Sequence, residues 1–112
     1  MSEPARIDPP AVIGARLIDL RHALGVDGEP ISQAEACRQS GVAPNTWNQC
    51  EKGNGRPDID EAIKVVKTFR VTLDWIYWGD ESGIPGGTLK KLQEQERRRL
   101  TSDRAGFPLS RE

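Results

Sequence analysis

Histidine and cysteine are scarce in this chain, which limits the chemistry that it can perform. Its 112 residues include one histidine, His22, and two cysteines, Cys37 and Cys50. No residue near His22 has the spacing of an activated nucleophile, and two cysteines without a histidine pair do not form a zinc site. We therefore expect a protein that is not an enzyme, with no catalytic residue, no metal and no cofactor.

Long hydrophobic runs are also missing. No apolar run approaches the roughly 20 residues that a membrane span needs. The first ten residues, MSEPARIDPP, lack the basic region and the apolar stretch of a secretion signal. We expect a cytoplasmic protein without membrane contact, in which Cys37 and Cys50 are reduced thiols. A redox switch between the two cysteines is an alternative that the sequence leaves open.

Strand-like alternation is absent as well, and apolar residues recur at helical spacing instead. Ser32 with Glu35, and Asp58 with Glu61, have the spacing of capping boxes, which mark the starts of helices. Glycines are placed to end four of the helices. The sequence therefore predicts an all-α domain of five short helices, over residues 11–24, 33–40, 44–52, 59–69 and 73–78.

Composition divides the chain into three parts. Residues 1–10 contain three prolines and no periodicity, so we expect a flexible N-terminal arm. Residues 11–79 form the predicted domain. Residues 80–112 begin as a linker and continue as a basic tail, with seven basic and four acidic side chains from residue 83 onward. Residues 88–100 favour a helix, but three leucines are too few to anchor it firmly, so we expect a solvated helix or an irregular end.

Two of the predicted helices are separated only by a tight turn at Gly41, which is the geometry of a helix-turn-helix. At helical spacing Asn45, Asn48 and Gln49 share one face of the second helix. Asn and Gln side chains can donate to and accept from the edge of adenine in the major groove, and one such pair gives roughly 1–3 kcal/mol of discrimination. The sequence thus predicts contacts with DNA bases, and an ordinary solvated helix face is the alternative.

From about residue 13 to residue 79 the chain resembles the lambda-repressor-like helix-turn-helix domains of phage repressors and Cro proteins. The resemblance rests on the stretches IGARLIDLRHALG, SQAEACRQSGVAPNTWNQCEKG and RPDIDEAIKVVKTFRVTLDWIYWGD, and on the order and spacing of all five helices. It implies a compact five-helix domain whose helix 44–52 lies in the major groove of DNA. The positions that match base-contacting residues are Pro44, Asn45, Asn48 and Gln49.

The resemblance also implies contacts that position the protein on the DNA backbone without reading its sequence. Gln33 matches a residue that holds a phosphate and braces the recognition helix. Arg21 matches an arginine that pairs with the glutamate equivalent to Glu51, and its five donors would let it reach a phosphate as well. The remaining predicted phosphate contacts, for which loop solubility or a local backbone bond is the alternative, are Thr46, Lys52 and Arg56.

Departures from the family pattern bear on the predicted interface. The loop over residues 26–30 is longer than usual, and the position before the recognition helix is Ala43 instead of Ser or Thr. Pro44 has no hydrogen-bonding side chain, so it can offer only a nonpolar contact, for example to a thymine methyl group. Several core positions are smaller than in the family, while Trp47 is larger. Because protein interiors are close-packed, we predict that Trp47 lies inward and refills the lost volume.

The predicted fifth helix, LDWIYW, has five large apolar side chains in six positions. One short helix cannot bury every side, so we expect Leu73, Trp75 and Ile76 in the core and Tyr77 and Trp78 outside. The last two are candidate contacts of a homodimer, and a lid over the first helix is the alternative. A twofold dimer would present two recognition helices about one DNA turn apart, roughly 34–36 Å, to an inverted repeat.

These features predict a sequence-specific DNA-binding transcriptional regulator of the phage-repressor type, with double-stranded DNA as its partner. Two other functions stay open, because a fold alone does not fix a function. One is an antitoxin that neutralises a protein partner through its tail, and the other is an adaptor that has kept the fold and lost DNA binding. The basic side chains of the tail could add phosphate contacts or a second oligomer surface; they are Lys90, Lys91, Arg97, Arg98 and Arg99.

Overall fold

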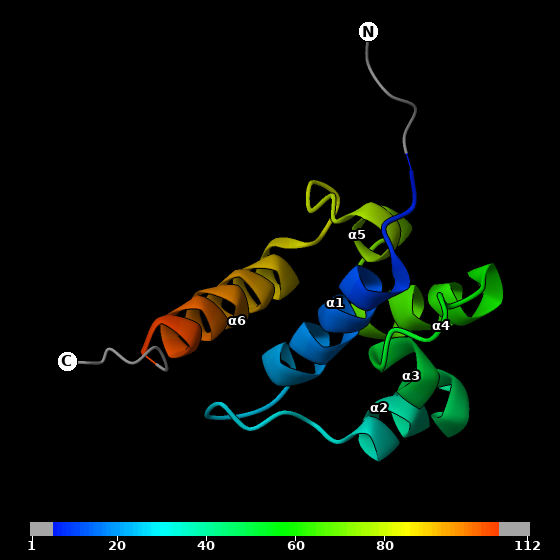
Figure 1. Ribbon diagram of the computed structural model, residues 1–112, viewed down its shortest axis with the longest axis horizontal. Helices are drawn as coiled ribbons and strands as arrows, with labels where there is room; N and C mark the ends of the chain where they lie inside the picture. The colour runs from blue at the N-terminus through cyan, green and yellow to red at the C-terminus, as the bar shows by residue number, and fades with distance from the viewer. Residues whose placement is uncertain (1–5, 106–112) are drawn as a thin grey trace, which may run out of the picture.

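The computed structural model describes residues 6–105, with side chains up to Thr101. All five predicted helices are present and a sixth follows them (Figure 1). Among the described residues no strand forms, apart from an isolated bridge between Val26 and Glu29. No helix in this part of the chain is both long and apolar enough to cross a membrane. The helices are α1 (Pro10–Ala23), α2 (Gln33–Ser40), α3 (Pro44–Glu51), α4 (Ile59–Phe69), α5 (Leu73–Trp78) and α6 (Gly86–Ala105).

Local side-chain bonds explain where the helices begin. The Ser32 hydroxyl accepts a hydrogen bond from the Glu35 backbone N–H at 3.0 Å, and the Asp58 carboxylate accepts one from the Glu61 N–H at 2.8 Å. Each bond satisfies a backbone donor that has no partner within its own helix. The helix starts predicted from the two capping boxes are therefore confirmed. By contrast, α3 begins at Pro44 without a side-chain cap.

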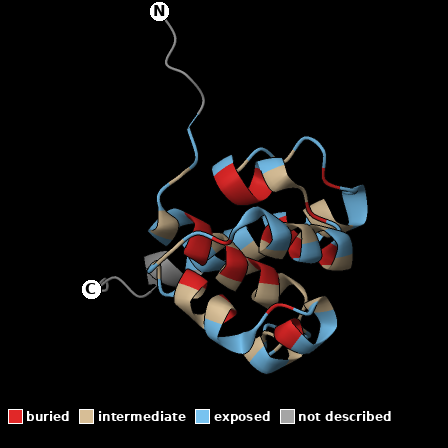
Figure 2. Cartoon of the chain, turned by 90° about the vertical axis from the view of Figure 1, so that its right-hand side faces the viewer, coloured by how far each residue is buried: buried red, intermediate tan, exposed pale blue. Residues whose placement is uncertain are grey.

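The core lies between α1 and the other helices, and Figure 2 shows the buried residues gathered on the inner faces of the helices. Trp47 is 1% exposed and is the largest fully buried side chain. Its ring meets that of Phe69 edge to face, with 6.3 Å between the ring centroids. The prediction that Trp47 lies inward is confirmed. Other buried core residues include Ile13, Leu17, Leu20, Ala36, Cys50, Ala62, Val65 and Ile76.

The sixth helix packs against α1 and runs beside it in Figure 1. Ile84, in the segment before α6, and Leu92, within it, are both buried. Arg99 pairs with Asp19 of α1 at 3.4 Å. Burial raises the pKa of Asp19, although Arg99 and Gln95 oppose that shift. Apolar and charged contacts together therefore hold α6 on the domain.

Asp8 joins the beginning of the described chain to two later segments. Its backbone N–H donates to the Tyr77 carbonyl at 2.7 Å, and its carbonyl accepts from Arg56 Nε at 2.8 Å. Its carboxylate pairs with Arg16. These contacts hold the start of α1 against the end of α5, while residues 1–5 of the expected arm lie outside the described residues.

Tyr77 lies inside the molecule, so the prediction that it stays outside with Trp78 is wrong. The side chain is buried, and its hydroxyl donates to the Pro57 carbonyl at 2.8 Å. A buried hydroxyl must find such a partner, and Pro57 supplies it from the loop between α3 and α4. Trp78, at 43% exposure, is the candidate dimer contact that remains on the surface.

Replacing this hydroxyl tests its part in holding the loop. Tyr77→Phe should lower the free energy of unfolding by about 1–2 kcal/mol, because the Pro57 carbonyl loses its donor and stays buried. Urea denaturation of the two proteins measures the difference. A Tyr77→Phe protein as stable as the wild type would show that the bond contributes nothing.

Candidate nucleic-acid interface

The turn between α2 and α3 is built around Gly41. The residue has φ 85°, a left-handed conformation that glycine adopts without strain. Its N–H bonds to the Cys37 carbonyl at 2.8 Å, which closes the last turn of α2. The Ser40 hydroxyl accepts from the Val42 N–H at 3.2 Å and donates to the Ala36 carbonyl at 2.8 Å. This short turn fixes the direction in which α3 leaves α2.

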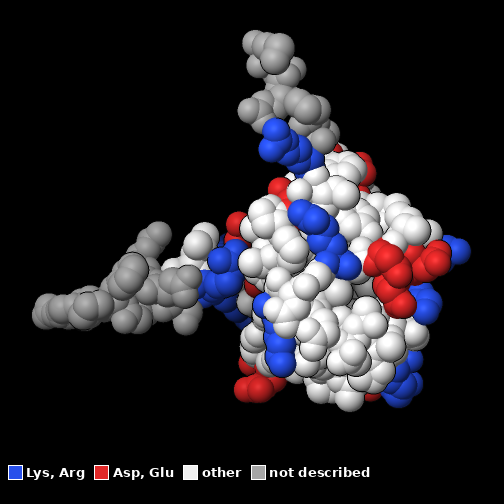
Figure 3. All heavy atoms as spheres, turned by 45° about the vertical axis from the view of Figure 1, so that its right-hand side comes forward, with Lys and Arg blue, Asp and Glu red and all other residues white. Residues whose placement is uncertain are grey.

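The predicted base-contacting residues occupy the outer side of α3. Pro44 and Asn45 are exposed, and Asn48 and Gln49 are half-buried. Gln49 Oε1 already accepts a hydrogen bond from Asn54 Nδ2 at 2.7 Å, which fixes the orientation of the Gln49 amide. Figure 3 brings the right-hand side of Figure 1 forward and shows a largely uncharged surface there, bordered by separate basic side chains and by a cluster of acidic side chains. The structure therefore brings these amides to one outward face.

The predicted phosphate contacts differ in how free their side chains are. Lys52 is exposed at the end of α3. Arg56 is exposed too, but its Nε is bound to the Asp8 carbonyl. Thr46 is half-buried on α3. Gln33, at the first position of α2, directs Nε2 to Glu51 Oε1 at 2.9 Å.

Arg21 is committed to contacts within the protein. Its Nε and Nη2 donate to the two carboxylate oxygens of Glu51 at 2.6 and 2.9 Å, so the pair is bidentate. Its Nη1 donates to the Ile31 carbonyl at 2.9 Å. The ion pair that the family resemblance implied is confirmed. The side chain is 15% exposed, and two of its five N–H groups take no part in these contacts.

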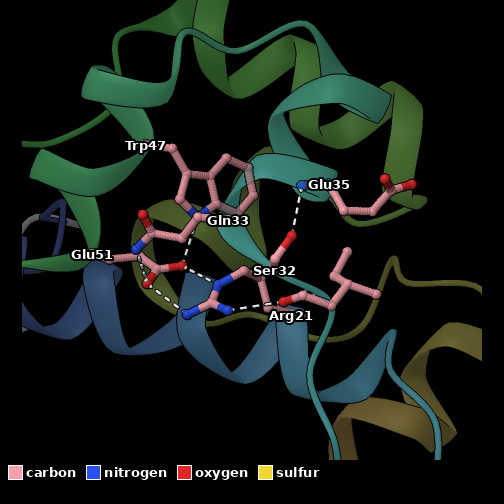
Figure 4. A network of polar contacts seen from close by, with 7 residues as sticks. Arg21, Ser32, Gln33, Glu35, Trp47 and Glu51 are labelled. Carbon is pink, nitrogen blue, oxygen red and sulfur yellow. Dashed lines mark hydrogen bonds and ion pairs between the residues drawn. The ribbon is translucent and has the colours of Figure 1, made fainter.

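Glu51 is the centre of a polar network that joins three helices (Figure 4). Its side chain is 5% exposed and also accepts a hydrogen bond from the indole N–H of Trp47. Burial is the largest influence on the pKa of Glu51 and would raise it. The hydrogen bonds from Arg21, Trp47 and Gln33 outweigh burial, so the pKa of this carboxyl lies below its usual value. Glu51 is therefore held ionised inside the domain.

The bond between Trp47 and Glu51 was not predicted from the sequence. The signal was present, since the two residues are four apart on one helix and lie on the same side of it. The prediction for Trp47 rested on the volume of its ring and did not include its N–H donor. The orienting bond from Asn54 to Gln49 was also missed.

The two cysteines are free thiols, and both are buried. Burial raises the pKa of the Cys50 thiol, with the carboxylates of Glu61 and Asp58 adding to the shift. Burial also raises the pKa of Cys37, and Glu51 adds to that shift. The thiolate is the reactive form of cysteine, so neither residue has the surroundings of a redox sensor.

Comparison with known proteins supports the geometry of this segment. Residues 31–76 match a protein-family model described as helix-turn-helix. Searches among curated proteins and among solved structures each gave no match. The matched segment contains α2, α3 and α4 and reaches into α5, so the turn at Gly41 and the amides of α3 lie inside it. Over residues 31–76 the chain therefore matches the helix-turn-helix family of the lambda-repressor-like type, and the arrangement of α2, the turn and α3 agrees with that match.

Proposed function

We propose that the protein is a repressor of the phage type, which binds an inverted-repeat operator as a homodimer with α3 in the major groove. The observation that carries the proposal is the amide face of α3. Within a helix-turn-helix, Asn45, Asn48 and Gln49 lie on the side of α3 that is not packed into the core. Helices of this kind read base edges with side chains at such positions.

Specificity would come from Asn45 and Gln49, with Asn48 beside them. Each amide can present a donor and an acceptor together, which matches N6 and N7 of adenine. The bond from Asn54 leaves the Gln49 NH₂ group free to donate. Pro44 would shape the fit through a nonpolar contact at the start of the helix.

Affinity would come from contacts with phosphate groups. Lys52 and Arg56 are exposed on either side of the loop that follows α3, and Gln33 opens α2. Gln33 can bond to Glu51 with one N–H of its amide and to a phosphate with the other. Thr46 and Arg21 complete the proposed set, Arg21 with the two N–H groups that Glu51 and Ile31 leave unused.

Trp78 is the proposed dimer contact. It is 43% exposed at the end of α5, and large aromatic side chains are enriched in protein interfaces. In this proposal residues 11–79 form the DNA-binding domain of a cytoplasmic protein, and the basic segment after it is available to a protein partner. Repression would follow from occupation of a promoter by the dimer.

A selection from random double-stranded DNA tests the proposal. The wild type should enrich one inverted repeat. In Asn45→Ala/Gln49→Ala the ratio of binding to this repeat over other sequences should fall by about 5- to 150-fold for each amide removed, which is the factor for one bidentate base contact. Gln93→Ala, which removes an exposed amide from α6, is the matched control and should behave as the wild type.

The possible failures of this experiment separate the parts of the proposal. The absence of any enriched sequence would refute sequence-specific binding. Enrichment of a single half-site would refute the dimer alone. If the double variant and the wild type enrich the same inverted repeat equally strongly, residues other than Asn45 and Gln49 read the bases.

A further inference from the structure

The two carboxylate oxygens of Glu51 have every acceptor position filled. Oε1 accepts from Arg21 Nη2 and Gln33 Nε2, each at 2.9 Å. Oε2 accepts from Arg21 Nε at 2.6 Å and from the indole nitrogen of Trp47 at 2.5 Å. A carboxylate has about four lone-pair positions, so the four donors leave none for water. These donors come from α1, α2 and α3, and they meet at the last residue of the recognition helix.

Trp47 is the most deeply buried of the donors to Glu51. It is 1% exposed and packs edge to face with Phe69, whereas Arg21 and Gln33 are partly exposed side chains with more rotatable bonds. Its indole and the Glu51 carboxylate are on the same helix, one turn apart. The bond therefore fixes the rotamer of Glu51 relative to the axis of α3. Without it, the carboxylate could turn and carry Arg21 and Gln33 with it.

The network reaches the DNA-contacting side of the domain through Gln33. That side chain stands at the first position of α2, and its amide is oriented by Glu51. Arg21 likewise holds the Ile31 carbonyl in the segment that leads into α2. The position of α2 relative to α3 thus depends on one carboxylate, and the orientation of that carboxylate depends on Trp47.

We infer that Trp47 is a positioning residue for sequence recognition: its indole N–H orients Glu51, and Glu51 sets the placement of the recognition helix against α1 and α2. The inference rests on the proposed function, because it concerns discrimination between DNA sequences. A side chain that only filled space would affect stability and would leave discrimination unchanged. The contribution of the N–H can therefore be separated from that of the ring.

Trp47→Phe removes the N–H and keeps an aromatic ring, and Trp75→Phe is its matched control. Trp75 is 5% exposed on α5 and is not among the donors to Glu51. Both variants should lose some stability, which denaturation will show. Only Trp47→Phe should reduce the ratio of binding to the selected inverted repeat over a scrambled duplex, by about tenfold, as the loss of a bond to a buried charged group predicts.

Two further readouts belong to the network itself. The pKa of Glu51, followed by NMR of its side-chain carboxyl carbon, should rise in Trp47→Phe and stay unchanged in Trp75→Phe. In a double-mutant cycle with Glu51→Gln, the two losses of discrimination should not add, because both act through the same carboxylate.

The outcomes distinguish the inference from the function on which it rests. A wild type without any preferred duplex would refute the proposed function, and the inference about recognition with it. A preferred duplex for which Trp47→Phe and Trp75→Phe discriminate equally well would refute the inference alone. Additive losses in the cycle, or an unchanged pKa of Glu51, would also overturn it.

Discussion

Trp47→Ala is expected to lower the free energy of unfolding by about 3–5 kcal/mol, the usual cost of truncating a buried aromatic side chain. Trp47 is the largest fully buried side chain of the domain, and it lies where α3 meets the ring of Phe69. Its removal leaves a cavity and also takes one donor from Glu51. A small domain has about 5–15 kcal/mol of total stability, so the variant should be largely unfolded on warming.

Circular dichroism during a thermal melt measures this effect directly. Val26→Ala is the control, because it truncates an apolar side chain at a position that is 72% exposed. A midpoint for Trp47→Ala within a degree or two of the wild type would show that the neighbouring side chains can close the cavity. The prediction that the ring of Trp47 fills volume that its neighbours cannot fill would then be wrong.

Arg21→Ala should destabilise the protein by a similar amount, about 3–5 kcal/mol at neutral pH. The substitution removes both bonds of a bidentate pair and leaves the Glu51 carboxylate, 5% exposed, without its counter-charge. It also frees the Ile31 carbonyl, which Arg21 Nη1 holds in the wild type. Denaturant unfolding of the wild type and the variant gives the difference, and Arg38→Ala, which removes an exposed pair with Glu35, is the control.

The pH dependence of this difference identifies its source. In the wild type the pKa of Glu51 is below its ordinary value of 4.5, so the stabilisation by its ionised form is fully present above that pH. It is lost as the pH falls through the lowered pKa. Arg21→Ala removes the largest influence that opposes burial at Glu51, so protonation of Glu51 in the variant relieves the cost of a charge without its partner. The difference between the free energies of unfolding of the wild type and Arg21→Ala should therefore become smaller below about pH 5. A difference that stays the same at every pH would contradict this account.

The parts of the fold that depend on neighbouring residues could be predicted from the sequence. The Ser32 and Asp58 caps act within three residues, and the structure has both bonds. The turn at Gly41 is equally local. The inward position of Trp47 was also predictable, because a single large residue among smaller core positions must occupy the space that they leave.

The parts that depend on distant segments could not be predicted. Tyr77 of α5 can be buried because the Pro57 carbonyl, in the loop between α3 and α4, accepts a hydrogen bond from its hydroxyl. The segment after α5 packs on the domain because Ile84 and Leu92 are buried together with the rest of the core, and because Asp19 lies within reach of Arg99. The prediction of a solvated helix or an irregular end rested on the small number of leucines in residues 88–100. It did not include the surface of α1 on which the segment packs. The amides of α3 were predictable as a face, whereas the bond from Asn54 that orients Gln49 depends on the loop after the helix.

The contacts of Asp8 bear on how this protein can be labelled. Because Arg56 binds the Asp8 carbonyl, a chain fused ahead of Asp8 would leave the molecule beside the loop that follows α3. The last turns of α6 lie at the left of the molecule in Figure 1, away from α2 and α3 at the lower right, so a chain fused after α6 would start far from those helices. A purification tag or a dye at the amino end would therefore start close to the loop that follows the proposed recognition helix. The carboxyl end is the better place for either one.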